Sequence, residues 1–208
     1  MREKQFYLVL LMDFFSIFPC LYLASVFKTM GMQLGDIDDR FLTFVGSIGS
    51  VANGLSRVCW GSMQDRLGFR TNYRIVLITE LFVFSLMPWI VHTNQYLYMV
   101  CVFMGYASLG AHFVLFPNVM VQIFGLKGGV QLCSFIYVTR CPSALSGLFI
   151  SKALVTNFGE ASYSIMCYTS CVFIIISTLV LETIFKDKPI RKDVEPEKEI
   201  CLPSINLE

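Results

Sequence analysis

The sequence predicts an all-α, polytopic membrane protein with six transmembrane helices, and three observations support that fold class. Hydrophobic residues make up 55% of the 208-residue chain and charged residues only 15%, with a mean hydropathy of +0.64. A water-soluble globule of this composition would lack the polar surface to cover itself. The apolar residues gather in six runs of about 20 to 25 residues, the length that a helix needs to cross a bilayer. The charged residues lie mostly between these runs, so the lipid bilayer is the expected surrounding of the chain.

The six runs are expected as spanning helices in chain order. They cover residues 6–30, 41–60, 73–91, 96–116, 130–154 and 163–185. The first run is too long for the apolar part of a cleavable signal peptide and lacks a small-residue cleavage site. We therefore expect it to remain as a spanning helix.

The second span carries small residues and one arginine on a single face, at spacings of four, four, three and four. They are Gly46, Ser50, Gly54, Arg57 and Gly61. Stripes of small residues let helices approach closely inside membranes, so helix packing is the favoured interpretation of the small residues. Arg57 differs from the others because a permanent charge in a span calls for a partner in the bundle interior.

Asp13 in the first span, Glu80 in the third and His112 in the fourth are ionisable side chains that could pair between helices or exchange protons. Each has two interpretations. An ion pair or hydrogen bond between helices is the favoured one, and a group that takes up and releases protons is the other.

The fifth and sixth spans differ in polarity. Arg140 lies near the middle of the fifth, where its charge is costly unless it faces water, an anion or a carboxylate. The sixth is apolar and contains two of the eight cysteines. The cysteines show no spacing typical of a zinc site, so they are expected to pack as small apolar side chains.

Basic residues predict which ends face the cytoplasm. If the N-terminus is cytoplasmic, the inner segments hold eleven basic residues and the outer loops hold Lys28, Arg40 and Lys152. The inner set is Arg2, Lys4, Arg66, Arg70, Arg74, Lys127, Lys186, Lys188, Arg191, Lys192 and Lys198. This excess follows the positive-inside rule, which predicts that both termini are cytoplasmic.

The polar loop between the second and third spans carries a family resemblance. Its residues Gly61, Asp65, Arg66, Gly68 and Arg70 resemble the Gly-x-x-x-Asp-Arg-x-Gly-Arg-Arg signature of major facilitator superfamily transporters, with Phe69 in place of the first of the two final arginines. In physical terms, Gly61 permits close helix approach, Gly68 permits a tight reversal, and Asp65 can pair with a cation or cap a helix.

The resemblance implies one six-helix half of that fold, the C-terminal half, built from two inverted three-helix repeats. In such a half the second and fifth helices are equivalent, so Arg57 and Arg140 are expected to approach one cavity. Their guanidinium groups would bind a mono- or dicarboxylate. In such a transporter, Asp13, Glu80 or His112 would couple transport to protons.

A closer resemblance concerns oxalate/formate antiporters and related proteins that are similar to monocarboxylate transporters. The run 55–61 is similar to the Gly-Arg-x-x-Trp-Gly pattern before the signature loop, with Ser56 in place of the glycine. The run 137–140 is similar to the place where those antiporters carry a substrate-binding lysine. This resemblance implies that Arg57 and Arg140 hold the substrate carboxylates.

The expected organisation is a six-helix membrane domain at 1–185 and a disordered cytoplasmic tail at 186–208, where charges of both signs alternate and three prolines occur. Half of a transporter fold cannot alternate access alone. The chain is therefore a truncated form, a partner of a second six-helix half, or a subunit of a homodimer. The alternative is a membrane protein that does not transport and serves only as an interaction partner.

Other function classes find little support in the sequence. It contains no nucleotide-binding loop, no spacing typical of metal ligands and no Ser-His-Asp arrangement, so no enzyme, cofactor or metal is expected. The basic residues are spread over membrane loops and form no single patch, so a nucleic-acid partner is not expected either.

Overall fold

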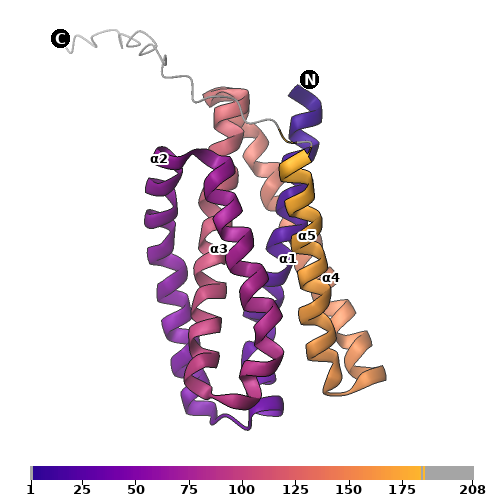
Figure 1. The fold of residues 1–208 in the computed structure, drawn as a ribbon. Helices are drawn as coiled ribbons and strands as arrows, with labels where there is room; N and C mark the ends of the chain where they lie inside the picture. Colours follow the sequence, from indigo (N-terminus) through magenta and orange to yellow (C-terminus); the bar gives the residue numbers. More distant parts are fainter. Residues whose placement is uncertain (1, 184, 186–208) are drawn as a thin grey trace, which may run out of the picture.

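A computed structural model of the chain describes residues 2–183 and residue 185, and this part is helical without strands. Five helices run lengthwise beside one another (Figure 1). They are α1 (Arg2–Gly35), α2 (Asp39–Thr93), α3 (Gln95–Phe124), α4 (Leu126–Phe158) and α5 (Ala161–Thr183). Each is long and apolar enough to cross a membrane. The chain is thus an all-helical, multi-pass membrane protein.

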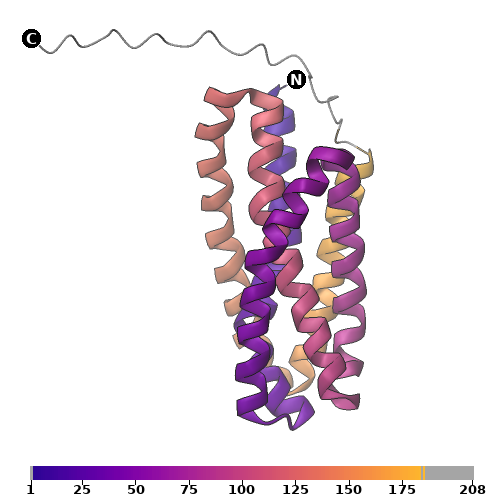
Figure 2. The same cartoon turned by 90° about the vertical axis from the view of Figure 1, so that its left-hand side faces the viewer.

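The 55-residue helix α2 is broken at Gly68, where φ is 77° and ψ is 167°. The Asn72 side-chain amide donates a hydrogen bond to the Trp60 carbonyl at 2.9 Å, although a straight helix would separate these residues by about 18 Å. The chain therefore reverses at Gly68, as Figure 2 shows. We call residues 39–67 the first arm of α2 and residues 69–93 the second arm. The expected second and third spans lie in these two arms.

The other connections are short and are held by capping groups. The Asp38 carboxylate accepts from the Arg40 backbone N–H at 3.0 Å before α2. The Asn94 side chain accepts from the Tyr96 backbone N–H at 2.8 Å before α3. Gly125 has a positive φ of 81° between α3 and α4, a backbone conformation that glycine adopts without steric cost.

Buried aromatic side chains fill the centre of the bundle. Tyr73 of the second arm is fully buried, and its ring stacks on Phe69 with centroids 5.3 Å apart. Its hydroxyl lies 2.8 Å from Ser16 Oγ of α1 and 2.7 Å from Ser177 Oγ of α5. One side chain therefore joins three elements of the core.

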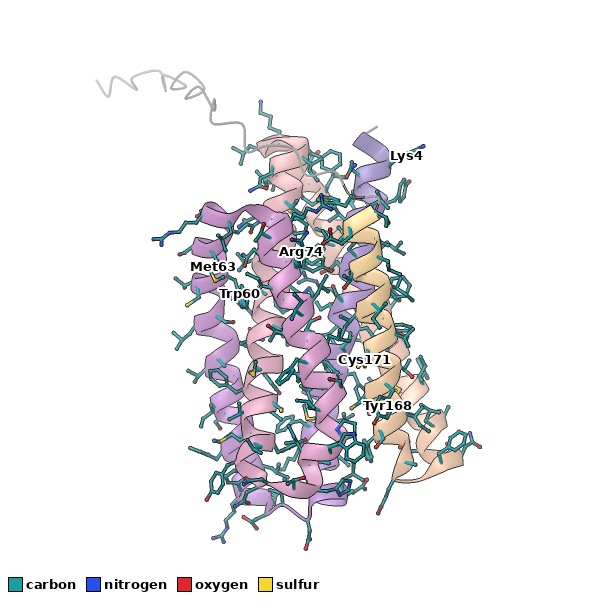
Figure 3. All side chains as sticks on the ribbon, in the orientation of Figure 1. Lys4, Trp60, Met63, Arg74, Tyr168 and Cys171 are labelled. Atoms are coloured by element: carbon teal, nitrogen blue, oxygen red, sulfur yellow. The ribbon has the colours of Figure 1, made fainter. Side chains whose placement is uncertain are left out.

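Ion pairs lie toward both ends of the bundle. Lys28 of α1 pairs with Asp39 of α2 at 2.9 Å. Toward the other end, Glu182 of α5 accepts from Arg70 at 2.8 Å and from Arg74 at 2.6 Å. Figure 3 places Arg74 toward the same end of the bundle as Lys4. The outer surface is apolar, as expected beside lipid, and Val58 and Phe149 are each 71% exposed.

The start of α1 and the end of α5 lie at one end of the bundle, together with the reversal at Gly68 (Figures 1 and 2). This arrangement agrees with termini on one side of a membrane, while the cytoplasmic assignment remains a prediction. The expected tail at 186–208 lies outside the described residues.

Candidate functional site

Four ionisable side chains from four elements meet in the buried centre of the bundle. Asp13 comes from α1, Glu80 from the second arm of α2, His112 from α3 and Arg140 from α4. Asp13 and Glu80 are fully buried, and Arg140 is only 7% exposed. The sequence singled out each of these residues, and the structure brings all of them together.

Arg140 forms a two-point ion pair with Asp13. Its Nε lies 3.2 Å from Oδ2, and its Nη2 lies 3.3 Å from Oδ1. Nη2 also donates to the His112 backbone carbonyl at 2.8 Å. Its Nη1 is buried and has no hydrogen-bond partner among the described residues. Arg140 is therefore neutralised by Asp13 but keeps unused donors for another acceptor.

His112 links the two buried carboxylates. Its Nε2 lies 2.7 Å from Glu80 Oε1, and its Nδ1 lies 3.8 Å from Asp13 Oδ1. The Cys20 thiol donates to the same Glu80 oxygen at 3.2 Å. The Nδ1–Oδ1 distance is too long for a hydrogen bond, and Nδ1 has no hydrogen-bond partner among the described residues. The hydrogen-bonded Cys20, Glu80 and His112 side chains and the neighbouring Asp13 are compatible with both expected interpretations, an interhelical contact and a group that takes up and releases protons.

The thiol, carboxylate and imidazole of Cys20, Glu80 and His112 place their ligand atoms within 4.8 Å of one another. These groups are the types that bind Zn²⁺, although here they already satisfy one another by hydrogen bonds. No sequence pattern indicates this grouping, because the three residues lie on three separate elements. The expectation of no metal stays a prediction.

Arg57 lies on the exposed side of the first arm. Its Nε and Nη2 donate to Asn53 Oδ1 at 3.2 Å and 2.9 Å. Asn53 is neutral, and no acidic side chain among the described residues pairs with Arg57, so its positive charge is uncompensated. An arginine held by an amide is well placed to receive an anion.

Phe113 of α3 connects the two arginines. The guanidinium carbon of Arg57 lies 4.6 Å from the ring centroid, and that of Arg140 lies 4.5 Å from it. The Arg140 guanidinium also lies 4.8 Å from the Tyr137 ring centroid. These are cation–π distances, so both cations contact the same ring.

Sequence reasoning did not assign roles to Phe113 and Asn53. Asn53 precedes Arg57 by four residues, a spacing that places both on one helix face and could have indicated the contact. Phe113 is far from both arginines in sequence, and no local pattern distinguishes it from the many apolar aromatic residues of the spans.

The residues of the signature loop take up separate positions. Gly68 makes the reversal, Asp65 and Arg66 are exposed, and Arg70 binds Glu182. A methyl group at Gly61 would lie 3.4 Å from Val114 of α3, an ordinary van der Waals contact, so the distance between these helices does not require glycine at this position.

Phe69, the departure from the signature, is 1% exposed. It packs against Tyr73, Phe116 and Phe185, with centroids 5.3 to 5.8 Å apart. An arginine at this position would bury a charge within that aromatic core, so the apolar residue suits this bundle.

The small-residue face of the first arm contacts its neighbours only in part. A Cβ at Gly46 would come within 2.9 Å of the Phe27 ring of α1. A Cβ at Gly54 would meet no described atom within 4 Å, and Arg57 one turn further on is exposed. The middle of this face therefore remains open beside Arg57.

Fold and site together define a multi-pass membrane protein with a buried charge cluster and, at the same aromatic ring, Arg57, which pairs with no acidic side chain among the described residues. No family model matches the chain. It is 26% identical over 201 residues to the oxalate:formate antiporter of Oxalobacter formigenes, covering 96% of this chain and 47% of that protein. It is 26% identical over 124 residues to apicoplast pyruvate carrier 1 of Toxoplasma gondii, covering 59% of this chain and 22% of the carrier.

Apicoplast pyruvate carrier 2 of the same organism is 24% identical over 157 residues, covering 74% of this chain and 24% of the carrier. The chain thus spans about half the length of the antiporter and about a quarter of each carrier. These distant similarities relate it to membrane transporters and not to enzymes.

Proposed function

We propose that the chain forms one six-span domain of a secondary transporter for small organic anions, with Arg57 and Arg140 as the substrate ligands. The observation that carries this proposal is the shared contact of both guanidinium groups with the Phe113 ring, at 4.6 Å and 4.5 Å. An anion beside Phe113 is within reach of both cations. The oxalate, formate and pyruvate named for the relatives are all small carboxylates.

Charge supports an anionic substrate. Two guanidinium groups beside one ring repel each other, and the Asp13 carboxylate balances only one of them. A bound carboxylate supplies the missing negative charge and accepts directional hydrogen bonds from the guanidinium fork. A neutral or cationic substrate would leave Arg57 uncompensated.

The six spans are the four unbroken helices and the two arms of α2, each arm counted separately. In this arrangement α1 and α2 form one three-helix repeat, and α3, α4 and α5 form the inverted second repeat. Alternating access requires a second domain that rocks against this one. That domain comes from another part of a longer chain, from a separate chain or from a second copy of this chain.

The Asp13, Glu80 and His112 cluster is the place where protons would couple to transport. His112 Nε2 is hydrogen-bonded to Glu80 Oε1 at 2.7 Å, so these two side chains can share one added proton. Asp13 Oδ1 lies 3.8 Å from Nδ1, beyond hydrogen-bond distance, so a proton would reach Asp13 only after the side chains move closer. Because Asp13 pairs with Arg140, this cluster lies directly beside one of the two arginines proposed to bind the substrate.

Uptake into proteoliposomes tests the proposal. Labelled oxalate, formate, lactate and pyruvate are offered to the purified chain, to Arg57→Gln and to the double variant Asp13→Asn with Arg140→Gln, which removes a buried pair without leaving a lone charge. Arg40→Gln, an exposed arginine at the opposite end of the first arm, is the matched control.

We expect saturable uptake by the wild type and by Arg40→Gln, and loss of uptake in both site variants with membrane insertion intact. Equal uptake in all four proteins would contradict the assignment of the arginines. Absence of uptake in well-folded wild-type protein would mean that transport needs the second domain, or that the chain is a membrane protein that does not transport.

A further inference from the structure

Asp13 limits the charge that the anion site can accept. Among the described residues, the carboxylate, imidazole and guanidinium groups that contact one another or Phe113 here are those of Asp13, Glu80, His112, Arg57 and Arg140. The negative charge of Asp13 and the positive charge of Arg140 cancel within their ion pair. Glu80 and His112 share a 2.7 Å hydrogen bond and add no charge when they hold an extra proton, or one negative charge when they do not. The balance is therefore at most one positive charge, that of Arg57.

The arginine N–H groups that remain without an acceptor agree with a site for a single carboxylate. The Nε and Nη2 groups of Arg140 donate hydrogen bonds to Asp13, and Nη2 also donates to the His112 carbonyl. The buried Nη1 of Arg140 has no hydrogen-bond partner among the described residues. The Nε and Nη2 groups of Arg57 donate hydrogen bonds to Asn53 Oδ1, and its Nη1 donates to no described residue. Each arginine thus offers one terminal nitrogen to an anion.

We infer that the site selects small monocarboxylates over dicarboxylates, with Asp13 as the residue that determines this specificity. The inference rests on the proposed function and refines its substrate class. A monoanion beside Phe113 brings the site to neutrality. A dianion leaves one negative charge uncompensated beside a partly buried aromatic ring, or must displace Asp13 from Arg140 and leave that carboxylate buried without its partner, and either outcome is costly.

Equilibrium binding of labelled pyruvate and labelled oxalate to the purified 208-residue chain in nanodiscs tests the inference. Both ligands are small, planar carboxylates and they differ by one charge at neutral pH. We expect the wild type to bind pyruvate at least about tenfold more tightly than oxalate, since a single uncompensated charge readily exceeds the energy of a tenfold ratio. This comparison needs no variant.

Asp13→Asn frees the second positive charge, and we expect the pyruvate-to-oxalate affinity ratio to fall by at least about tenfold, by improved oxalate binding. Asp13→Glu keeps the charge and should keep the wild-type ratio, which separates charge from packing. Retained elution as a single species in size-exclusion chromatography confirms that each variant is folded.

Oxalate binding as tight as pyruvate binding in the wild type, or an unchanged ratio in Asp13→Asn, would overturn the inference. If binding in those cases is still lost in Arg57→Gln, the proposed function stands, and only the inferred selection of monocarboxylates by Asp13 fails. If neither anion binds the wild type, or if Arg57→Gln binds as the wild type does, the proposed function fails and the inference fails with it.

Discussion

Asp13 and Arg140 form a two-point ion pair inside the bundle, 127 residues apart in sequence, with Nε–Oδ2 and Nη2–Oδ1 distances of 3.2 Å and 3.3 Å. The pair joins α1 to α4 and places a neutralised guanidinium against the same Phe113 ring that Arg57 contacts. Two arginines that look equivalent in sequence thus differ in charge balance, and the proposed chemistry of the site follows from that difference.

Arg140→Gln should destabilise the protein strongly, because Asp13 would remain buried without its counter-charge. Removal of one partner from a buried pair costs about 3–5 kcal/mol. We expect a loss of that size in the free energy of unfolding measured by SDS titration. The double variant Asp13→Asn with Arg140→Gln should recover most of it. If the single and double variants were equally unstable, the pair would not be the cause.

Asn53→Asp should weaken anion binding without loss of fold. Asn53 Oδ1 already accepts two hydrogen bonds from Arg57, so a carboxylate in the same place would neutralise that arginine. We expect the affinity for labelled pyruvate to fall by at least about tenfold, as binding would leave an uncompensated negative charge. Asn53→Ala keeps the arginine uncompensated and should retain more affinity. Equal losses in both variants would indicate that positioning, and not charge, is the role of Asn53.

Phe113→Leu should weaken anion binding because it removes the ring that holds both guanidinium groups. Each cation–π contact contributes about 0.5–2 kcal/mol, so the two together correspond to a loss of about fivefold or more in affinity. Phe113→Tyr keeps the ring and serves as the control in the same binding assay. A leucine variant that binds as the wild type does would show that the ring does not position the arginines.

Gly68→Ala should destabilise the reversal in α2. The φ of 77° and ψ of 167° at Gly68 fall in a region that is essentially restricted to glycine, and other residues pay about 1–3 kcal/mol there. Gly54→Ala in the first arm is the matched control, since a Cβ there meets no described atom within 4 Å and alanine favours the helix. SDS titration should show a loss for the first variant and no loss for the second. A neutral Gly68→Ala would mean that the turn is not strained.

Tyr73→Phe should destabilise the core because the hydroxyl joins Ser16 and Ser177 in a fully buried place. Both serine hydroxyls keep a hydrogen bond to the Met12 carbonyl, so the expected loss is that of net hydrogen bonds, about 0.5–1.5 kcal/mol each. Tyr7→Phe removes a hydroxyl from a side chain that is 68% exposed and should be neutral in the same SDS titration. Similar effects of the two variants would argue against the buried network.

The sequence predicts the membrane helices well because long apolar runs have few other stable environments. It also predicts the reversal near Gly68, but it treats 61–70 as a loop. The structure continues the first arm through the polar residues to 67 and starts the second arm at 69, so the turn is much shorter than the polar run. Polarity indicates exposure at a membrane surface and does not by itself indicate an irregular backbone.

The site was predicted residue by residue but not as an assembly. The cost of charge in a span singles out Asp13, Glu80, His112, Arg57 and Arg140, while their pairing depends on how helices pack. Asp13 meets Arg140 across 127 residues, and Glu80 meets His112 across 32, so no local spacing indicates either contact. The aromatic bridge at Phe113 was missed for the same reason.

The central claim is that Arg57 and Arg140 hold one carboxylate, and solid-state NMR distance measurement tests it most directly. The chain carries ¹⁵N-labelled arginine guanidinium groups and binds pyruvate labelled with ¹³C at the carboxylate. We expect carbon–nitrogen contacts of about 4 Å to two arginines, as a hydrogen-bonded guanidinium–carboxylate pair requires. Arg57→Gln should remove one contact, and the double variant Asp13→Asn with Arg140→Gln should remove the other. A bound carboxylate that shows no arginine contact, or contacts that persist in both variants, would contradict the claim.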